Sequence, residues 1–326
     1  MRTLRAGILG PGSIAAKHAQ ALKALAGAVE LVAVCGRDRD RTTAFATAHG
    51  GSVYTDFAVM LADARLDLLI VALPPFAHAG EVEQAAAAGI HLLVEKPIAL
   101  NRQRADAMVA AATASGVRAA VGFMYRHGAA VRAWRELDPG PVALITAAYH
   151  CNALHTPWWR DETKSGGQLL EQAIHLIDLV RHLVGEPTWV IARRGNLLHR
   201  DVPGYTGEDV SAVIFEGEGG WLANLTASNV ATPGVWRKGW DIFGRDLTGR
   251  FEGWNDAVLT PTVTGTEPRK VKGTTDVFVA QLADLIDAIR HDRDPYVPLA
   301  EGAASLRLAL AARQAADERR EVRLDV

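Results

Sequence analysis

Leu92-Leu93-Val94-Glu95-Lys96-Pro97 is an apolar run that stops at an acid, a lysine and a proline. The run is short and includes a β-branched valine, so it predicts a buried strand with Glu95 and Lys96 at its carboxyl end. Pro97 has no amide hydrogen to offer a ladder and therefore ends the strand. Ligands of open parallel sheets bind beyond the carboxyl ends of the strands, so Lys96 is expected beside a small molecule.

Outward from this strand, apolar runs alternate with helical patterns over the first 121 residues. The predicted strands are 4–9, 31–35, 53–54, 68–72, 91–94 and 118–121, and the predicted helices are 13–25, 39–49, 77–88 and 102–115, the last behind the cap Asn101. This alternation predicts an α/β fold whose first part is a doubly wound parallel sheet of the Rossmann type with right-handed crossovers.

The pattern changes near Phe123. One strong helix, about 168–184, is followed by short strands separated by turn residues, and within 221–228 apolar residues alternate with partly polar ones. That alternation is typical of an antiparallel sheet covered on one side. We therefore predict a dinucleotide-binding domain over 1–123 and a substrate-binding α/β domain over 124–326.

Composition excludes several functional classes. The 326 residues carry a net charge of −2 with mixed signs, which gives no basic stripe for nucleic acid and no basic amphipathic helix for a membrane. The 2 cysteines form neither a disulfide framework nor a metal cluster. No signal-peptide core and no apolar run of membrane-spanning length is present, so we expect a soluble cytoplasmic protein.

A glycine turn follows the first predicted strand. In Gly10-x-Gly12-x-x-Ala15, the first glycine allows a tight turn, the second admits a pyrophosphate, and alanine replaces the third glycine for close packing. The amides of Ser13 and Ile14 at the start of the next helix favour phosphate binding. The alternative is a simple strand-to-helix turn, but the surrounding βαβ unit favours a dinucleotide.

The end of the second strand decides which dinucleotide is preferred. Gly36 stands where a carboxylate normally holds the ribose hydroxyls, and Arg37 follows it. A guanidinium can pair with a 2′-phosphate, so NAD(P) is expected with a preference for NADP. Asp38 turning inward would reverse that preference, and Arg37 as a solvated loop charge would leave it undecided.

The helix near Gln168 is predicted to carry Glu171, His175, Asp178 and His182 along one stripe, because their spacings are four, three and four residues. Gly166-Gly167 before the helix allows backbone or ligand to approach closely. The structural alternatives are a surface or interdomain ion pair for Asp178 and a solvent-facing His182. A metal site at Glu171 and His175 has no third ligand at a recognised spacing, so no metal is predicted.

These residues together resemble the Gfo/Idh/MocA oxidoreductases. The resemblance covers nearly the whole chain and rests on 10–15, 73–78, Glu95-Lys96-Pro97, and the segment from Gly166 to Asp178. It implies an amino-terminal Rossmann domain and a carboxyl-terminal α/β domain with a large, mainly antiparallel open sheet through which members often form homodimers or homotetramers. It also implies oxidation or reduction of CH–OH groups of sugars, inositols and related compounds with NAD or NADP.

The resemblance further implies the roles of individual residues. Lys96 and His175 would be the catalytic pair, with His175 taking the hydroxyl proton and Lys96 stabilising alkoxide character on the same oxygen. The implied cofactor contacts outside the glycine turn are Gly36, Arg37, Leu73, Pro74, His78, Glu95 and Lys96, and a structural role remains the alternative for His78. Two departures reshape the substrate pocket: Glu171 replaces the usual aspartate, and Ser165 replaces a third glycine.

A loop rich in aromatic and charged residues precedes the helix. Trp158, Trp159 and Arg160, with Tyr125 and Arg126 at the domain junction, suit a sugar ring or an anionic group on it. Packing in the core or a dimer contact is the alternative for the tryptophans. Two other functions also stay open: a dinucleotide-binding redox sensor without turnover, and a redox-assisted glycoside hydrolase that holds NAD tightly.

Overall fold

The computed structural model describes residues 2–152 and 154–324. The chain divides into two compact units, the first made of Met1–Met124 with Asp276–Ala303 and the second of Tyr125–Thr275 with Ala304–Val326. The predicted boundary after residue 123 lies next to the observed one. The assignment of 276–303 to the second domain is wrong, because this segment packs into the first unit.

The elements of the first unit follow the predicted alternation, except that α3 (Phe57–Asp63) was not predicted and α11 (Val277–His291) was assigned to the second domain. They are β1 (Leu4–Leu9), α1 (Ser13–Ala24), β2 (Val29–Cys35), α2 (Arg39–His49), β3 (Ser52–Tyr54), α3 (Phe57–Asp63), β4 (Leu68–Val71), the 3-10 turn η1 (Pro75–Ala77), α4 (Glu81–Ala87), β5 (His91–Val94), α5 (Arg102–Ala114), β6 (Ala119–Val121) and α11 (Val277–His291). Asn101 caps α5 as predicted, since its Oδ1 accepts the amide of Arg104 at 2.9 Å.

The first sheet is wholly parallel, in the order β3-β2-β1-β4-β5-β6. This confirms the doubly wound Rossmann sheet. The central strands are buried on both faces, and all four residues of β4 are buried, as expected for a parallel sheet covered by helices. The ends of β1, β4 and β5 therefore deliver the glycine turn, Leu73 and Lys96 to one edge of the sheet.

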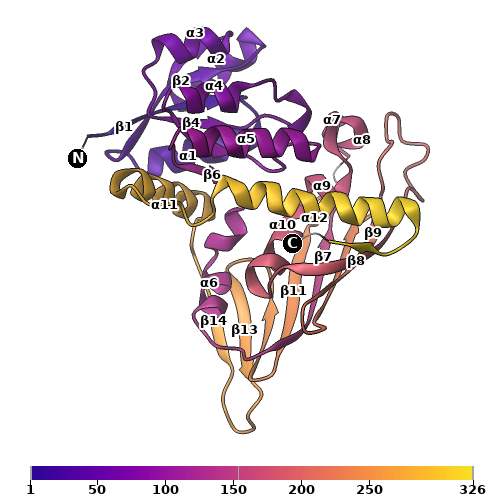
Figure 1. Ribbon diagram of the computed structural model, residues 1–326. Helices are drawn as coiled ribbons and strands as arrows, with labels where there is room; N and C mark the ends of the chain where they lie inside the picture. The colour runs from indigo at the N-terminus through magenta and orange to yellow at the C-terminus, as the bar shows by residue number, and fades with distance from the viewer. Residues whose placement is uncertain (1, 153, 325–326) are drawn as a thin grey trace. The chain divides into compact units, whose positions relative to one another are not determined.

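Helix α11 explains why 276–303 belongs to this unit. It packs beside α1 (Figure 1), and its Leu282, Leu285 and Ile286 join the hydrophobic core formed by α1 and the strands. These three aliphatic side chains are fully or nearly fully buried. Burial of each one contributes roughly 1.5–3 kcal/mol to the free energy of unfolding. A segment 150 residues beyond the predicted boundary thus completes the first core.

The second unit contains a large mixed sheet and several short helices (Figure 1). Its elements are α6 (Ala129–Arg135), β7 (Val142–His150), α7 (Pro157–Arg160), α8 (Glu162–Ser165), α9 (Gln168–Glu171), α10 (Ile174–Leu183), β8 (Pro187–Gly195), β9 (Val210–Gly217), β10 (Leu222–Ser228), β11 (Arg237–Gly244), β12 (Leu247–Phe251), β13 (Asp256–Pro261), β14 (Arg269–Lys272) and β15 (Val322–Arg323). The 3-10 turn η2 (Met124–His127) and α12 (Leu299–Glu318) span two of the three points where the chain passes from one unit to the other.

The second sheet is mainly antiparallel, as expected. Its order is β14-β13-β12-β11-β7-β10-β9-β8-β15, and only the β7–β10 pair of the described strands is parallel. Along β10, Ala223, Leu225 and Ala227 are buried, whereas Leu222 and Asn224 are exposed. The predicted alternation is therefore confirmed, with one face of the sheet packed and the other open.

The predicted single helix over 168–184 is wrong, because it is interrupted after Glu171. The amide of Ala173 bonds to the carbonyl of Gln168, five residues back, at 2.9 Å. Such a widened turn breaks the regular spacing of side chains on which the stripe argument depended. Glu171 thus lies on α9, while His175 and Asp178 lie on α10. In the described ranges, the helices are all too short or too polar to cross a bilayer.

Candidate active site

The turn between β1 and α1 has the shape of a phosphate site. Gly10 has a φ of +92°, and a Cβ there would lie 2.7 Å from the carbonyl oxygen that follows β4, so only glycine fits. Gly12 is the N-cap residue that precedes α1, and no side chain among the described residues caps that helix. The first amides, on Ser13, Ile14 and Ala15, are consequently available to an anion. The residues present fit the pyrophosphate of a dinucleotide.

The end of β2 leaves no room for an acidic side chain. A Cβ on Gly36 would lie 2.6 Å from both Cδ of Pro11 and Oγ1 of Thr42. Arg37 is exposed, and Asp38 uses its Oδ1 to accept the amide of Arg41 at 3.0 Å as the cap of α2. Asp38 is therefore directed to its own helix, and the first side chain after the strand end is the exposed Arg37.

His78 lies before α4 rather than inside it. The helix predicted from Ala77 begins at Glu81, because Gly80 has a left-handed φ of 111° that interrupts the turn begun at Pro75. Nδ1 of His78 hydrogen-bonds Oε1 of Glu81, whose Oε2 accepts the amide of Ala79 at 2.7 Å. Burial opposes the ionisation of Glu81, yet the bond from His78 prevails and lowers the pKa of that carboxyl. Leu73 and Pro74 are half-buried at the end of β4.

Glu95 and Lys96 follow β5 as predicted. Glu95 is 5% exposed, and its carboxylate accepts hydrogen bonds from Nε2 of His18 at 2.7 Å and from the amide of Lys96 at 3.1 Å. The Lys96–Pro97 peptide bond is cis. Lys96 thus projects from a backbone segment that a buried carboxylate holds in place.

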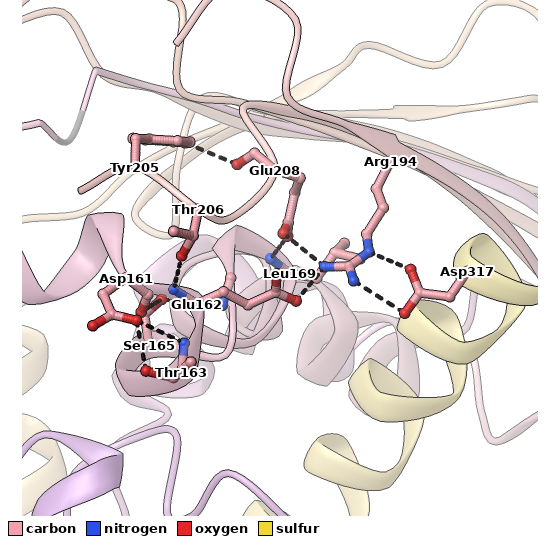
Figure 2. Close-up of polar contacts among 11 residues, drawn as sticks. Asp161, Glu162, Thr163, Ser165, Leu169, Arg194, Tyr205, Thr206, Glu208 and Asp317 are labelled. Atoms are coloured by element: carbon pink, nitrogen blue, oxygen red, sulfur yellow. Dashed lines mark hydrogen bonds and ion pairs between the residues drawn. The ribbon is translucent and has the colours of Figure 1, made fainter. Parts of the chain in front are cut away.

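The glycines before α9 admit a buried acid rather than a ligand. Gly167 has a φ of +86°, and a Cβ there would lie 2.3 Å from Oε2 of Glu208. Figure 2 shows Glu208 at the centre of a polar network, where it accepts the amide of Leu169 at 2.8 Å and an N–H of Arg194 at 3.1 Å. A carboxylate at the start of a helix satisfies amides that have no intrahelical partner. Burial raises the pKa of Glu208, and Arg194 opposes that rise.

The same network anchors the segment before the helix. Arg194 also pairs with Glu162 at 2.6 Å and with Asp317 of α12 at 2.7 Å (Figure 2). Ser165, the departure from a third glycine, is buried and donates to the carbonyl of Asp161 at 3.0 Å. The Ser165 hydroxyl therefore links the last residue of the short helix α8 to Asp161, the residue that precedes it.

His175 lies in a column of aromatic rings. Tyr125 stacks on His175 with centroids 4.3 Å apart and, on its other face, on Trp254 at 4.5 Å. Burial raises the pKa of Tyr125, so its phenol stays neutral. Such stacking fixes the imidazole plane. Glu171 is also buried in this unit, 6% exposed.

Lys238 belongs to the same group of side chains, and the sequence analysis missed it. Its Nζ lies 6.0 Å from the ring centre of Tyr125, 5.1 Å from Tyr149, 4.8 Å from Trp236 and 5.8 Å from Trp254. These are cation–π distances. Lys238 on β11 lies opposite Tyr149 on β7 in the sheet. The two residues are nearly ninety positions apart in the chain, so no local sequence motif predicts their contact.

Arg126 and Asp178 form a buried bidentate ion pair. Nε of Arg126 lies 2.9 Å from Oδ2 of Asp178 and Nη2 lies 2.6 Å from Oδ1, which also accepts the hydroxyl of Ser305 at 3.1 Å. Asp178 does form an ion pair, but the expected surface or interdomain pair is wrong, because this pair is buried inside one unit. The guanidinium of Arg126, predicted to meet substrate, is engaged by this carboxylate.

The remaining predicted residues have contacts of their own. Trp158 and Trp159 pack edge to face at 5.8 Å on α7 and are half-buried. Arg160 donates to the carbonyl of Leu154 at 2.7 Å through Nε, so it stabilises its own loop. His182, expected in solvent, is instead half-buried, and burial followed by the charge of Arg126 lowers its pKa to about 3. In the described part of the chain, no cluster of His, Cys, Asp and Glu has the form of a metal site.

Comparison with known proteins places these two units in one family. Residues 4–123 match the oxidoreductase family with an NAD-binding Rossmann fold, GFO_IDH_MocA, and residues 129–248 match the GFO/IDH/MocA C-terminal domain. Inositol 2-dehydrogenase from Rhizobium meliloti (strain 1021) is 32% identical over 237 residues, which is 71% of each chain. Levoglucosan dehydrogenase in complex with NADH and L-sorbose has the same fold, with a TM-score of 0.92, 19% identity and 100% coverage of both chains.

A further relative matches over a shorter stretch. Glucose-6-phosphate 3-dehydrogenase from Bacillus subtilis (strain 168) is 35% identical over 187 residues, or 54% of this chain and 53% of that protein. The match thus spans about half of that relative's length. With both domain families matched in order along the sequence, the chain belongs to the GFO/IDH/MocA family of oxidoreductases with an NAD-binding Rossmann fold.

Proposed function

We propose that the protein is an NAD(P)-dependent dehydrogenase or reductase that transfers hydride between the nicotinamide and a carbinol or carbonyl carbon of a sugar, an inositol or a derivative of one. The observation that carries this proposal is the open, uncapped start of α1 behind Gly10 and Gly12, found in a chain whose relatives include inositol and sugar dehydrogenases. A bound nicotinamide dinucleotide supplies the hydride acceptor or donor.

Lys96 and His175 form the proposed catalytic pair. In the oxidative direction, His175 would take the hydroxyl proton as the carbinol is oxidised to a carbonyl, and a bound dinucleotide would accept the hydride from the same carbon. Lys96 donates a hydrogen bond to that oxygen and stabilises its developing negative charge. The stack of Tyr125 on His175 supports this role, because a base fixed in orientation loses less entropy on reaching the transition state.

The substrate would meet the aromatic group in the second unit. Tyr125, Tyr149, Trp236 and Trp254 offer ring faces of the kind on which sugars pack, and Lys238 adds a hydrogen-bond donor among them. Glu171, Trp158, Trp159 and Arg160 remain proposed contacts from the sequence. We assign Arg126 to the support of α10, since Asp178 holds its guanidinium.

NADP is the proposed preferred cofactor. The closed packing at Gly36, the exposed Arg37 and the capping role of Asp38 support it together, because they leave a cation and no carboxylate near a 2′-phosphate.

We further propose that the protein forms a homodimer or homotetramer through its second sheet. The open face of the sheet exposes Ile191, Ile214, Leu222 and Phe243, each between 42% and 44% exposed. Apolar side chains gathered on one face are typical of an interface between copies. Sedimentation equilibrium measures the subunit number directly. Cytoplasmic location stays a prediction from the sequence.

Turnover of a panel of sugars and polyols, followed by nicotinamide absorbance, tests the activity. Lys96→Met and His175→Asn are expected to lower kcat by about 10²–10⁴ while dinucleotide affinity persists. Lys23→Met and His291→Asn are matched controls, since both side chains are exposed, and they should leave kcat unchanged. Near-normal turnover in either of the first two variants refutes the assigned roles.

The same panel separates the other functions. Glycoside cleavage without net absorbance change would identify a redox-assisted hydrolase, and tight dinucleotide binding with neither reaction would identify a sensor.

A further inference from the structure

The carboxylate of Glu95 is occupied by protein donors. Oε1 lies 2.7 Å from Nε2 of His18, and Oε2 accepts the backbone amide of Lys96 at 3.1 Å. The His18 side chain is 0% exposed and that of Glu95 is 6% exposed. Each oxygen of this buried carboxylate thus has a protein donor. The carboxylate is therefore placed to hold neighbouring protein groups rather than to bind a ligand.

Gly122 provides the space in which this carboxylate lies. A Cβ at that position would be 2.8 Å from Oε2 of Glu95 and 2.9 Å from both Oε1 and Cδ. The φ of Gly122 is not in the left-handed region, so glycine is required here for space and not for backbone conformation. The amide of Gly122 bonds to the carbonyl of Val94 at 2.8 Å. The ends of β5 and β6 are thus packed around the Glu95 side chain.

The His18 ring also contacts α11. The ring meets the edge of Phe278 on α11, with centroids 5.3 Å apart and planes at 85°. Within 2–152 and 154–324, nothing hydrogen-bonds to Nδ1 of His18. The proton therefore belongs on Nε2, the nitrogen that faces the carboxylate, because the carboxylate already accepts from the Lys96 amide and can only accept again.

We propose that His18 and Glu95 are positioning residues for Lys96. Glu95 fixes the peptide from which the Lys96 amine projects, and His18 fixes Glu95. This inference rests on the proposed function in one respect, that Lys96 acts on the reacting oxygen.

The His18–Glu95 pair (the dyad) also connects the two elements of the proposed nucleotide site, α1 and β5. His18 lies on α1, whose amino terminus at Gly12 is the proposed phosphate site, and Lys96 follows β5. One short hydrogen-bonded chain from α1 to β5 therefore sets the position of the amine relative to the helix that receives the dinucleotide. An error of about 1 Å in such a position is sufficient to lower a rate by about 10²-fold.

The test compares His18→Asn with His18→Gln. The amide nitrogen of glutamine reaches the place of Nε2 and can still donate to Glu95, whereas that of asparagine reaches only the place of Nδ1. Both variants are polar, but asparagine is one methylene smaller and leaves more empty space at this buried position. The control variant described below therefore separates general loosening from a loss of positioning. Positioning predicts that glutamine restores what asparagine loses.

The first readout does not depend on activity. Labelling with 15N-lysine allows hydrogen exchange of the Lys96 amide to be followed by NMR in the full chain. His18→Asn is expected to speed this exchange at least about tenfold, since the amide loses a firmly held acceptor, and His18→Gln to stay within about threefold of the original protein. Should either substitution prevent folding, Glu95→Gln, which keeps the shape and removes the charge, provides the same measurement.

His78→Gln is the matched control for the exchange experiment. It removes a second His–Glu pair in the same unit, with the same side-chain exposures of 0% and 6%, but one that does not bond to the Lys96 amide. It should leave exchange at Lys96 unchanged. Equal acceleration in His78→Gln and His18→Asn would show general loosening of the unit and would overturn the proposal.

The second readout is kinetic. His18→Asn is expected to lower kcat by about 10- to 100-fold with the KM for the dinucleotide within about threefold, and His18→Gln to recover most of kcat. Faster amide exchange with unchanged kcat would overturn the positioning role. If the unsubstituted protein turns over no sugar or polyol, the proposed function fails, and the exchange result still decides whether the dyad holds Lys96.

Discussion

Replacement of Gly167 by alanine tests a tightly packed turn of the second unit. Gly167 has a φ of +86°, and a Cβ there would lie 2.3 Å from Oε2 of Glu208. Two penalties add. A non-glycine residue in the left-handed region costs about 1–2 kcal/mol, and pushing a buried carboxylate away from its partners approaches the ~3–5 kcal/mol typical of a broken buried pair.

Gly219→Ala separates these penalties. Gly219 has a φ of +84°, but a Cβ there would meet no heavy atom within 4 Å. We therefore expect a loss of about 1–2 kcal/mol of unfolding free energy for Gly219→Ala. For Gly167→Ala we expect about 4–7 kcal/mol, because the penalty for straining the Glu208 contacts to Leu169 and Arg194 adds to the backbone penalty.

The assay is urea unfolding followed by tryptophan fluorescence. All 8 tryptophans lie in the second unit, so the signal reports the unit that contains both glycines. In a Glu208→Ala background, Gly167→Ala should add no more than Gly219→Ala does, because the clashing carboxylate is gone. Equal losses for the two glycines in the original background would refute the reasoning.

Three further predictions concern the cofactor, the acid stability and the substrate. Arg37→Ala is expected to weaken NADPH binding about tenfold or more and to leave NADH unchanged by calorimetry, and equal effects on both would contradict the proposed phosphate contact. His182 has a folded-state pKa of about 3, below its ordinary 6.5, so the unfolded chain binds more protons between these values and stability falls as pH drops through that window. His182→Gln should flatten this loss, which is at most about 1.4 kcal/mol per pH unit, in urea titrations at several pH values, and an unaltered slope would exclude His182 as its source. Lys238→Met should raise the KM for the sugar about tenfold without changing that for the dinucleotide, and an unaffected sugar KM would remove Lys238 from the site.

Local patterns in the sequence were sufficient for the parallel sheet of the first unit. Hydrophobic alternation identified its parallel strands, the Gly10–Gly12 turn identified the start of α1, and Pro97 marked the end of β5 at Lys96. These features are encoded within a few consecutive residues, because strand period, helix start and turn geometry depend on neighbouring positions. The resemblance to the family added the expected role of His175, which spacing alone did not give.

Only the tertiary structure decided which distant side chains meet. The entry of α11 into the first core, the pair of Arg126 with Asp178, and the aromatic surroundings of Lys238 each join segments from about fifty to more than two hundred positions apart. The same holds for Gly167, whose need for glycine comes from a carboxylate at position 208. Periodicity tells which face of an element is buried but not which partner covers it, because the partner is set by strand register and packing over the whole unit.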